Sequence, residues 1–370
     1  MTQGTPSPFI GQPFKRKTVI ASGSLILVTG ANGYIASHVV NQLLQLGYNV
    51  RGTIRAEKPW LEQFFAKKYG EGRFQTMLLP AFTKDALEPV LQGVSAVIHL
   101  VCPTYACFHH SESTDSQKQA SDVSMNPNPH TVIPLAVGNV LNLLETAANH
   151  PSIRRFVLTS STTAAFTLQP GKKGIVVDND TWNNESVRAA WDPDTPGELK
   201  PFLVYTASKT EAERKAWEWV RLNEPSFAFN SVLPFMNFGT ILHPNIGGST
   251  MNFPRSLLAG ETSCMKFGPQ WYVNVEDTAR LHVIAALDME VESERLWACA
   301  APMNWAQIIG ILQNLRPNNT LIPKAPADEP QDYTEIIGSR RASKLLHDFF
   351  GITDWTSLEQ SLESGISDLL

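Results

Sequence analysis

The stretch VTGANGYIASHVV, residues 28–40, carries the clearest structural signal in this chain of 370 residues. An apolar run at 24–30, SLILVTG, precedes the turn, and YIASHVVNQLLQLG at 34–47 follows it with apolar residues at helical spacing. The glycines therefore lie in a strand–turn–helix unit. Gly30 permits the tight turn, and Gly33 lets the backbone approach a ligand closely.

A helix that follows such a turn begins with unpaired backbone N–H groups and the positive end of its dipole, both of which favour a phosphate. Ala36 occupies the third glycine position of the dinucleotide-binding pattern and still allows the helix to pack on the strand. In this context the turn predicts a dinucleotide site rather than a purely structural turn. The cofactor-binding residues expected here are Gly30, Asn32, Gly33, Tyr34 and Ile35.

Short apolar runs alternate with amphipathic segments from residue 24 to residue 234. Further strands are expected at 49–55, 73–79, 94–101, 153–161 and 227–234, and further helices at 132–150 and 203–223. Strands rich in Val, Ile and Leu that alternate with helices predict a parallel sheet covered on both faces. The predicted fold class is therefore α/β: a doubly wound (Rossmann) parallel sheet with a smaller C-terminal α/β substrate lobe.

The pattern loosens after residue 234, and this change sets the predicted domain boundaries. These are an N-terminal extension at 1–22, a dinucleotide-binding Rossmann domain at 23–234, and a substrate-binding lobe at 235–270 and 291–370. Residues 271–287 resemble a strand that runs into a helix, so we expect 271–290 to return to the main sheet. The polar, Ser-rich and aperiodic segment 108–130 predicts a mobile insertion after the fourth strand.

The end of the second strand indicates which nicotinamide cofactor fits. An NAD site needs an acidic residue there to accept a hydrogen bond from the ribose 2′-OH, whereas residues 51–58 read RGTIRAEK. Arg55 is placed to clamp a 2′-phosphate, and Lys58 adds a point charge. Glu57 argues the other way but follows the strand end, and a structural or surface role accounts for Arg51. The sequence favours NADP(H) over NAD(H).

Three residues form the predicted catalytic group: Ser161 at the end of the fifth strand, and Tyr205 and Lys209 on the helix 203–223. Tyr and Lys four residues apart share one helix face, so the ammonium can lie beneath the phenol. A nearby cation favours the phenolate of a tyrosine, whose usual pKa is ~10. Such a tyrosine can protonate a carbonyl oxygen as hydride arrives, while a serine hydroxyl holds the developing oxyanion.

Together these features resemble the short-chain dehydrogenase/reductase superfamily in its extended branch, and more closely the fungal aldehyde and ketone reductases related to dihydroflavonol reductase. The similar blocks cover nearly the whole chain: VTGANGYIASHVV, GYNVRGTIR, RRFVLTSSTTAA, VYTASKTEAE, NSVLP and YVNVEDTARLH. The resemblance implies Ser161 as the triad serine, with Ser160 as the alternative. It implies that Tyr205 is the acid, and that Lys209 adjusts the pKa of Tyr205 and contacts the ribose. It also implies that the segment from Pro234 borders the nicotinamide.

Two departures from that group concern cofactor affinity and substrate entry. The group carries an Asp after the third strand that contacts adenine, and residues 79–81 here read Leu-Pro-Ala. The group also has a short segment after the fourth strand, where this chain has the insertion 108–130. Neither departure affects the predicted triad.

Composition limits the partners. A net charge of −5 and a charged fraction of 18% argue against nucleic acid or an anionic membrane surface. The N-terminus has no signal-peptide pattern, and the four cysteines show no CxxC spacing, so a cytoplasmic protein is expected, as a monomer or homodimer. No metal is expected. The side chains considered as metal ligands lie in a polar, aperiodic loop in which no supporting second shell is visible: His109, His110, Glu112, Asp115 and His130.

The sequence therefore predicts an NADPH-dependent reductase of an aldehyde or ketone, with a small-molecule carbonyl substrate as its partner. The Trp- and Phe-bearing segment 235–271 is expected to line a pocket for a bulky, apolar or secondary-metabolite carbonyl. One alternative is an epimerase, dehydratase or isomerase on the same scaffold. The other is a non-catalytic NADP-sensing protein, against which the retained Tyr205–Lys209 pair argues.

Overall fold

The computed structural model describes residues 16–101 and 126–369, so most of the segment 108–130 lies outside the described residues. Within them, a seven-stranded sheet has the order β10-β7-β5-β4-β1-β2-β3, with every neighbouring pair parallel. Its strands are β1 (Leu25–Thr29), β2 (Asn49–Ile54), β3 (Phe74–Leu78), β4 (Val94–His99), β5 (Arg155–Thr159), β7 (Ala228–Pro234) and β10 (Arg295–Ala298). The predicted doubly wound α/β fold is confirmed.

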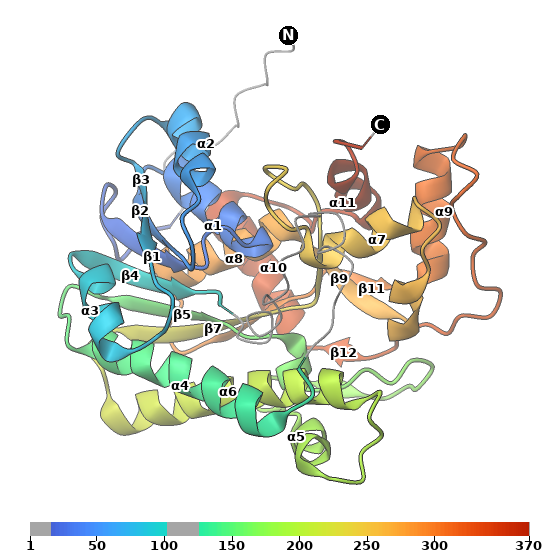
Figure 1. The fold of residues 1–370 in the computed structure, drawn as a ribbon, viewed down its shortest axis with the longest axis horizontal. Helices are drawn as coiled ribbons and strands as arrows, with labels where there is room; N and C mark the ends of the chain where they lie inside the picture. The colour runs from blue at the N-terminus through green and yellow to red at the C-terminus, as the bar shows by residue number, and fades with distance from the viewer. Residues whose placement is uncertain (1–15, 102–125, 370) are drawn as a thin grey trace.

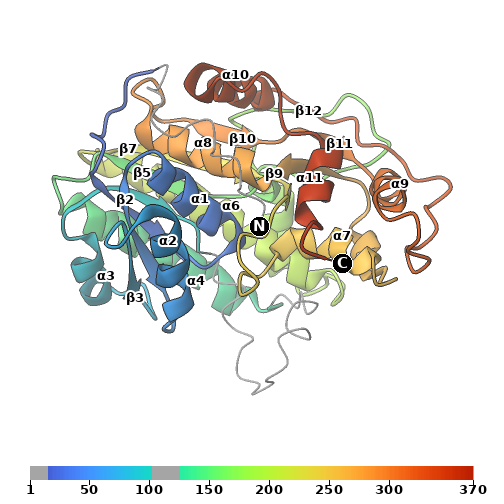
Figure 2. The ribbon, with the colours of Figure 1, turned by 90° about the horizontal axis from the view of Figure 1, so that it is seen from above.

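Helices cover both faces of this sheet (Figures 1 and 2). One layer comprises α1 (Tyr34–Gln45), α2 (Pro59–Tyr69), α8 (Val275–Leu287) and α10 (Gly338–Phe350). The other comprises α3 (Lys84–Leu91), α4 (Pro129–Ala148) and α6 (Lys200–Asn223), with α5 (Asn184–Trp191) packed on α6. Ile26 and Val28 of β1 pack into the first layer, whereas Leu27 packs into the second. This alternation is what a strand buried on both faces requires.

The smaller lobe lies beside the carboxyl edge of the sheet, on the right in Figure 1. Its three-stranded sheet is formed by β8 (Met236–Phe238), β9 (Gln270–Asn274) and β11 (Ala301–Met303). Around it lie α7 (Asn252–Leu257), α9 (Trp305–Leu315), α11 (Leu358–Gly365) and the 3₁₀ helices η4 (Ser249–Met251) and η5 (Ser263–Phe267). A short parallel pair, β6 (Val176–Val177) with β12 (Glu335–Ile336), joins two connecting segments.

Part of the expected chain path after residue 270 is wrong. The strand within 271–287 does not rejoin the main sheet, because β9 pairs with β8 and β11. The chain turns at Asn274, whose side chain accepts a hydrogen bond from the Glu276 N–H and caps α8, so only the helix returns to the main sheet. The seventh main strand is β10, inside the range 291–370 expected for the lobe. Its four residues are too few to show a sequence period.

Helix α4 is long and apolar enough, by length and composition, to cross a membrane. In the structure it packs along α6 and α3, and Val140, Leu143 and Leu144 lie in the core that these helices share with the sheet. This is the packing of a core helix. It begins at Pro129, three residues before the predicted start, because Asn128 caps it by accepting from the His130 N–H and Pro129 fits the first turn.

Candidate active site

The strand order changes direction between β1 and β4, and ligands of doubly wound sheets bind outside the carboxyl ends of the strands at that point. Thr29 ends β1 and His99 ends β4, and the Thr29 hydroxyl lies 2.9 Å from His99 Nδ1. The Leu100 N–H donates to the same hydroxyl at 3.0 Å. The Thr29–His99 hydrogen bond ties the two strand ends together beneath the expected nucleotide site.

The turn after β1 leaves the first N–H groups of α1 open. Gly30 has φ +66°, in the left-handed region where a side chain is strained. Gly33 caps α1 without a side-chain hydrogen bond, and the first turn of α1 holds no acidic residue. Nothing in this turn competes with an anion for the helix N-terminus, so its residues fit the pyrophosphate of a dinucleotide.

The turn rests directly on β2. The Ala31 N–H donates to the Thr53 carbonyl at 3.0 Å, and the Gly30 N–H donates to Thr53 Oγ1 at 3.2 Å. A Cβ atom at Gly52 would lie 2.5 Å from the Ala31 Cβ and 2.9 Å from the Phe74 ring. Glycine at position 52 is therefore required for the close approach of turn and strand, a constraint that the sequence analysis did not recognise.

The remaining motif residues differ in what they present to this site. Asn32 lies half-buried in the turn, and Ile35 packs partly buried between the main core and the lobe. The Tyr34 side chain turns away into the lobe, where its hydroxyl donates to the Gly239 carbonyl at 2.7 Å. Burial raises the pKa of Tyr34 well above its usual value, so this phenol stays neutral. Only the backbone of Tyr34 faces the predicted nucleotide turn.

Two cations lie at the end of β2, as a 2′-phosphate site requires. Arg55 is exposed just beyond the strand, and Lys58 is half-buried at the cap position of α2. Among the described residues, neither forms an ion pair. Arg51 has a structural role, since its Nη1 donates to the carbonyls of Val90 and Gln92, and burial lowers its pKa.

The position after β3, where the similar reductases carry an Asp, is apolar in the structure as well. Leu79 is buried in the second core layer, and its N–H donates to the Ile54 carbonyl at 2.8 Å. Pro80 is exposed. This position therefore contributes packing at the strand end rather than an acidic contact to an adenine.

The predicted catalytic residues lie on two segments that pack on one another, α6 and the segment that follows β5. Ser161 is buried and caps the 3₁₀ helix η3 (Thr162–Ala164). Its Oγ accepts from the Thr163 hydroxyl at 2.9 Å and from the Thr163 N–H at 3.3 Å. From α6, which packs on η3, Lys209 Nζ donates to the Thr159 carbonyl at 3.3 Å. Tyr205 lies half-buried one turn earlier on α6.

Ser160, the alternative triad serine, turns its hydroxyl into the protein. Its Oγ donates to Glu213 Oε2 at 2.8 Å, and both side chains are buried. A serine held in this way is directed away from the strand end where Ser161 lies. This geometry favours Ser161 over Ser160 as the serine that meets a substrate.

Two buried histidines that the sequence analysis did not assign to the site lie beside it. Burial and the neighbouring Lys209 ammonium lower the pKa of His99 to about 3. Burial lowers the pKa of His282 to about 4, and its Nδ1–H donates to the Thr278 carbonyl at 2.8 Å. His282 Nε2 then accepts from the Thr159 hydroxyl at 2.7 Å. Both rings are neutral and hold the strand ends in place.

Pro234, expected near the nicotinamide, ends β7 next to η3. Its carbonyl lies 3.4 Å from Thr162 Oγ1, which donates to it. The following Phe235 N–H donates to the Ala298 carbonyl on β10 at 3.2 Å. Pro234 therefore contacts Thr162, the residue that follows Ser161, at the carboxyl edge of the sheet.

Half-buried aromatic rings lead from α6 into the lobe. The ring centroids of Tyr205 and Phe202 are 6.5 Å apart, those of Phe202 and Phe267 are 6.4 Å apart, and Phe253 stacks on Phe267 at 5.4 Å. A second group joins Phe166, Phe235 and Trp271, with centroid distances of 5.9 Å and 6.3 Å. The expected aromatic segment 235–271 therefore supplies rings on the lobe side of Tyr205.

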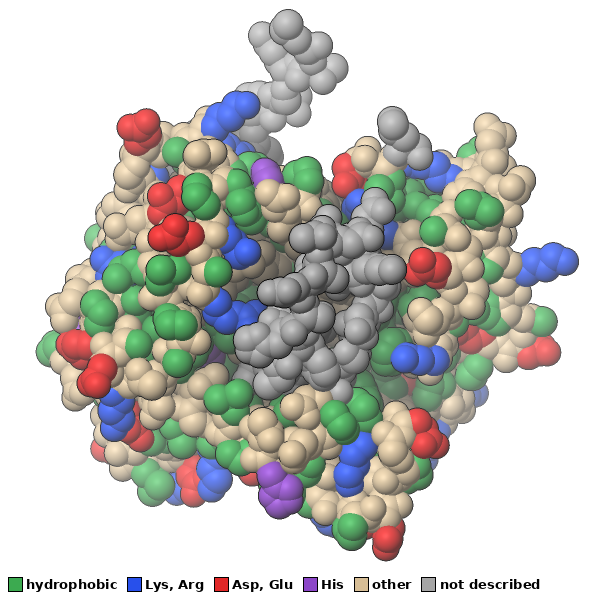
Figure 3. All heavy atoms as spheres, in the orientation of Figure 1, with side chains coloured by type: hydrophobic (Ala, Val, Ile, Leu, Met, Phe, Trp, Pro, Cys, Tyr) green, Lys and Arg blue, Asp and Glu red, His purple; other side chains and the backbone are tan. Residues whose placement is uncertain are grey.

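Other surface features lie apart from this site. The face seen in Figure 3 mixes both signs of charge with hydrophobic side chains and shows no broad basic patch.

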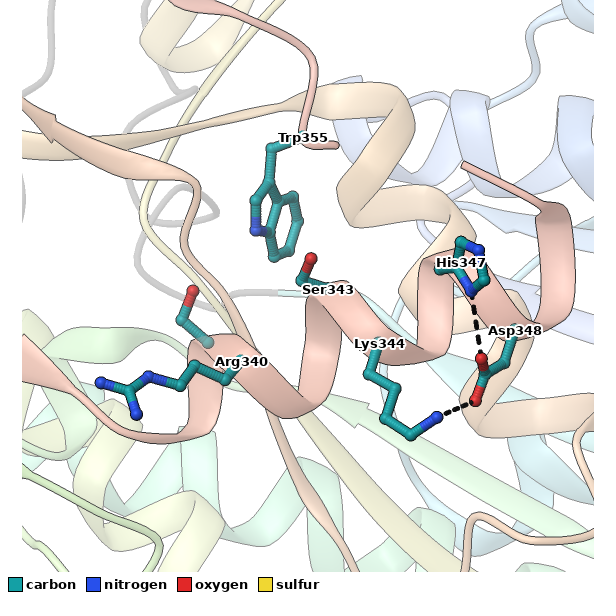
Figure 4. A pocket seen from close by; sticks show the side chains of 7 residues that line it. Arg340, Ser343, Lys344, His347, Asp348 and Trp355 are labelled. Atoms are coloured by element: carbon teal, nitrogen blue, oxygen red, sulfur yellow. Dashed lines mark hydrogen bonds and ion pairs between the residues drawn. The ribbon is translucent and has the colours of Figure 1, made fainter. Parts of the chain in front are cut away.

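A shallow groove of about 570 Å³ runs along the outer side of α10 (Figure 4). Its lining residues are Ser339, Arg340, Ser343, Lys344, His347, Asp348 and Trp355. It lies on the helix layer opposite α6 and holds none of the predicted site residues.

The residues weighed as metal ligands lie almost wholly outside the described ranges. Only His130 is described, and its ring packs edge-on against Trp191 at 4.9 Å. Within residues 16–101 and 126–369, no group of three His, Cys, Asp or Glu side chains could hold a metal ion.

Comparison with known proteins shows which family this chain belongs to. The model of the NAD-dependent epimerase/dehydratase family matches residues 26–297. Ketoreductase adrE of Penicillium rubens is 44% identical over 94% of this chain and 97% of its own length. Aldehyde reductase 2 of Sporidiobolus salmonicolor is 36% identical over 93% of this chain and 96% of its own length.

Solved structures agree with the fold. The yeast methylglyoxal/isovaleraldehyde reductase Gre2, complexed with NADPH, superimposes with a TM-score of 0.72 at 22% identity. That match covers 93% of this chain and 97% of the yeast chain. The expected similarity to fungal ketone and aldehyde reductases is confirmed, and the chain belongs to the NAD-dependent epimerase/dehydratase family, the extended branch of the short-chain dehydrogenases/reductases.

Proposed function

We propose that this protein is an NADPH-dependent oxidoreductase that reduces an aldehyde or ketone. The observation that carries the proposal is the contact between Lys209 Nζ and the Thr159 carbonyl, two residues before Ser161. It brings the Tyr205–Lys209 face of α6 to the end of β5, on the sheet edge that also carries the open nucleotide turn. The ketoreductase and aldehyde reductase relatives support the same reaction class.

Bound NADPH supplies the hydride for this chemistry. The backbone of the turn Gly30–Gly33 and the N-terminus of α1 would hold its pyrophosphate. Arg55 and Lys58 would hold the 2′-phosphate, and the segment from Pro234 would border the nicotinamide. Arg55 gives a charge-assisted, fork-shaped donor, which suits a phosphate better than the ribose hydroxyl of NADH.

The serine is prepared to donate its proton. Ser161 Oγ already accepts two hydrogen bonds from Thr163, so its own O–H remains to donate to the substrate oxygen. Tyr205 gives its phenolic proton to that oxygen as negative charge develops, and the Lys209 ammonium stabilises the phenolate left behind. The burial of Ser161 strengthens these interactions by excluding water.

The substrate proposed is bulky and apolar. Phe202, Phe267 and Phe253 form a row of half-buried rings from Tyr205 into the lobe, and Phe235 with Trp271 forms a second apolar surface. Such rings offer large contact areas and few hydrogen-bond partners. A large ring ketone or aldehyde, of the kind found among secondary metabolites, matches this lining better than a small polar carbonyl compound.

The test is NADPH consumption over a panel of carbonyl compounds, with Tyr205→Phe and Tyr333→Phe compared. Loss of the Tyr205 proton donor is expected to lower turnover by about 10²–10⁴-fold with NADPH affinity nearly unchanged. Tyr333 is 46% exposed, so its variant is a matched control and should retain turnover. Equal turnover of wild type and Tyr205→Phe would overturn the assignment.

A second candidate is an epimerase or dehydratase on the same scaffold. A relative from Aspergillus terreus named NAD-dependent epimerase/dehydratase terH is 32% identical over 93% of this chain. Such an enzyme regenerates its nicotinamide in each turnover, so it converts substrate without net loss of NADPH. Stoichiometry of one NADPH oxidised per product formed excludes it.

We also propose a cytoplasmic location, with the protein a monomer or homodimer. The two cysteines in the described part of the chain, Cys264 and Cys299, are buried free thiols. Unpaired cysteines are typical of a reducing compartment.

A further inference from the structure

A buried carboxylate lies behind the proposed catalytic group. Glu213 on α6 has no solvent exposure and accepts hydrogen bonds from Ser160, Ser231 and Arg295. The Ser160 and Ser231 hydroxyls lie at 2.8 Å and 2.7 Å, and Arg295 donates from Nε at 2.9 Å and from Nη2 at 3.1 Å. A buried charge is tolerated only when it is compensated in this way.

The partner cation is itself fixed on several sides. The Arg295 guanidinium lies 4.0 Å from the ring centroid of Trp182, and Nη1 donates to the carbonyls of Asn179 and Thr181. Trp297 adds a hydrogen bond from Nε1 to Asn179 Oδ1 at 2.7 Å. Arg295 is therefore held on several sides, and its two hydrogen bonds in turn hold the Glu213 carboxylate.

The placement of Glu213 on α6 connects this anchor to the chemistry. Tyr205, Lys209 and Glu213 follow one another at four-residue spacing, so they lie along one side of the helix. Lys209 donates to Thr159, and Glu213 accepts from Ser160. Two successive turns of α6 thus hold two successive residues at the end of β5, and the next residue is Ser161.

A small cavity of about 20 Å³ adjoins this pair of contacts. Its lining includes Ser160, Lys209 and Glu213, together with apolar residues of α4 and β5. The cavity has room for about one water molecule, so side-chain packing against the strand end is incomplete on this side. The hydrogen bonds from α6 therefore act together with the Ser160 N–H bond to the Val232 carbonyl and with the Thr159–His282 contact to hold this strand end.

We propose that Glu213 is a positioning residue for the reaction: through Ser160 it fixes the end of β5 so that Ser161 meets Tyr205 and Lys209 in register. Ser231, which donates to the same carboxylate from β7, has no such role. This inference rests on the proposed reductase function, and its test includes a measurement that needs no activity.

The two serines provide a matched pair of variants. Ser160→Ala and Ser231→Ala each remove one buried hydroxyl donor to Glu213 and leave the ion pair with Arg295 intact. For Ser160→Ala we expect kcat to fall about tenfold or more with KM for NADPH nearly unchanged, because small displacements at a reacting centre cost rate. Ser231→Ala should keep kcat within about twofold at a similar loss of thermal stability. Ser160→Thr, which keeps the hydroxyl, should recover most of kcat.

Hydrogen exchange of the amides in residues 158–166 gives the second measurement. Ser160→Ala is expected to speed exchange in this peptide, and Ser231→Ala to leave it near the wild-type rate. Equal exchange in the two variants, or equal kcat, overturns the proposal. Absence of NADPH-dependent reduction in the wild type would instead refute the proposed function, and the exchange comparison would still decide whether Glu213 holds this strand end through Ser160.

Discussion

Replacing Gly52 by alanine tests the close contact between β2 and the nucleotide turn. A Cβ atom there would lie 2.5 Å from the Ala31 Cβ and 2.9 Å from the Phe74 ring. Carbon atoms pack best at about 3.5–4.0 Å, so the turn or the strand must shift by about 1 Å. Since Ala31 lies between Gly30 and Gly33, this shift displaces the N–H groups that would hold the pyrophosphate.

The expected magnitude follows from overpacking. An extra methyl in a tightly packed site costs about 1–3 kcal/mol of the free energy of unfolding. A displacement of about 1 Å at a binding site should weaken NADPH binding by about tenfold or more. The variant should therefore lose both stability and cofactor affinity.

The assays are thermal unfolding and a fluorescence titration with NADPH. Gly138→Ala in α4 is the matched control, because a Cβ atom there meets nothing within 4 Å. Alanine is favoured over glycine inside a helix by about 0.5–1 kcal/mol, so this variant should gain stability and keep its affinity. Unchanged melting temperature and NADPH affinity in Gly52→Ala would refute the reasoning.

Three further predictions concern the cations, the rings and the buried histidines. Arg55→Ala should weaken NADPH binding by about tenfold or more and leave NADH binding nearly unchanged, since only NADPH carries the 2′-phosphate. Paired titrations that show equal losses of affinity for the two cofactors would contradict the cofactor assignment. Phe202→Ala should raise KM for a large apolar ketone while sparing a short-chain aldehyde, and uniform effects across a substrate series would argue against the aromatic row as a substrate contact. Because His282 and His99 titrate near 6.5 when unfolded but at about 4 and about 3 in the folded protein, only the unfolded chain takes up these protons as pH falls below 6.5. The free energy of unfolding should therefore decrease from about pH 6.5 towards pH 4, with a shallower slope in His282→Asn; urea melts at a series of pH values that show no change of slope would be inconsistent with these burial effects.

The sequence predicted most of the sheet because its strands are buried on both faces and read as continuous apolar runs. Strands such as β1 and β4 match their predicted ranges to within two residues. β10 was missed because a four-residue strand carries no period, and β9 was misplaced because alternation along a strand does not reveal its partner.

The candidate site was predictable where chemistry demands a fixed spacing. Gly30 and Gly33 follow a strand, and the Tyr205–Lys209 spacing follows the helix repeat, so both could be found in the sequence. Glu213 and Arg295 could not be paired, because they are 82 residues apart and meet only through the tertiary fold. Tyr34 was expected among the cofactor-binding residues of the turn, and the direction of its phenol into the lobe depends on the Gly239 carbonyl, which no local pattern indicates.

The measurement that tests the central claim most directly is transfer of deuterium from NADPH labelled at the nicotinamide C4 position to a carbonyl substrate. A reductase that works through Ser161, Tyr205 and Lys209 transfers the label to the former carbonyl carbon, with one NADP⁺ formed per alcohol. Tyr205→Phe should slow this transfer by about 10²–10⁴-fold while the protein still binds the labelled cofactor. Product that forms without deuterium and without net oxidation of NADPH would contradict the account.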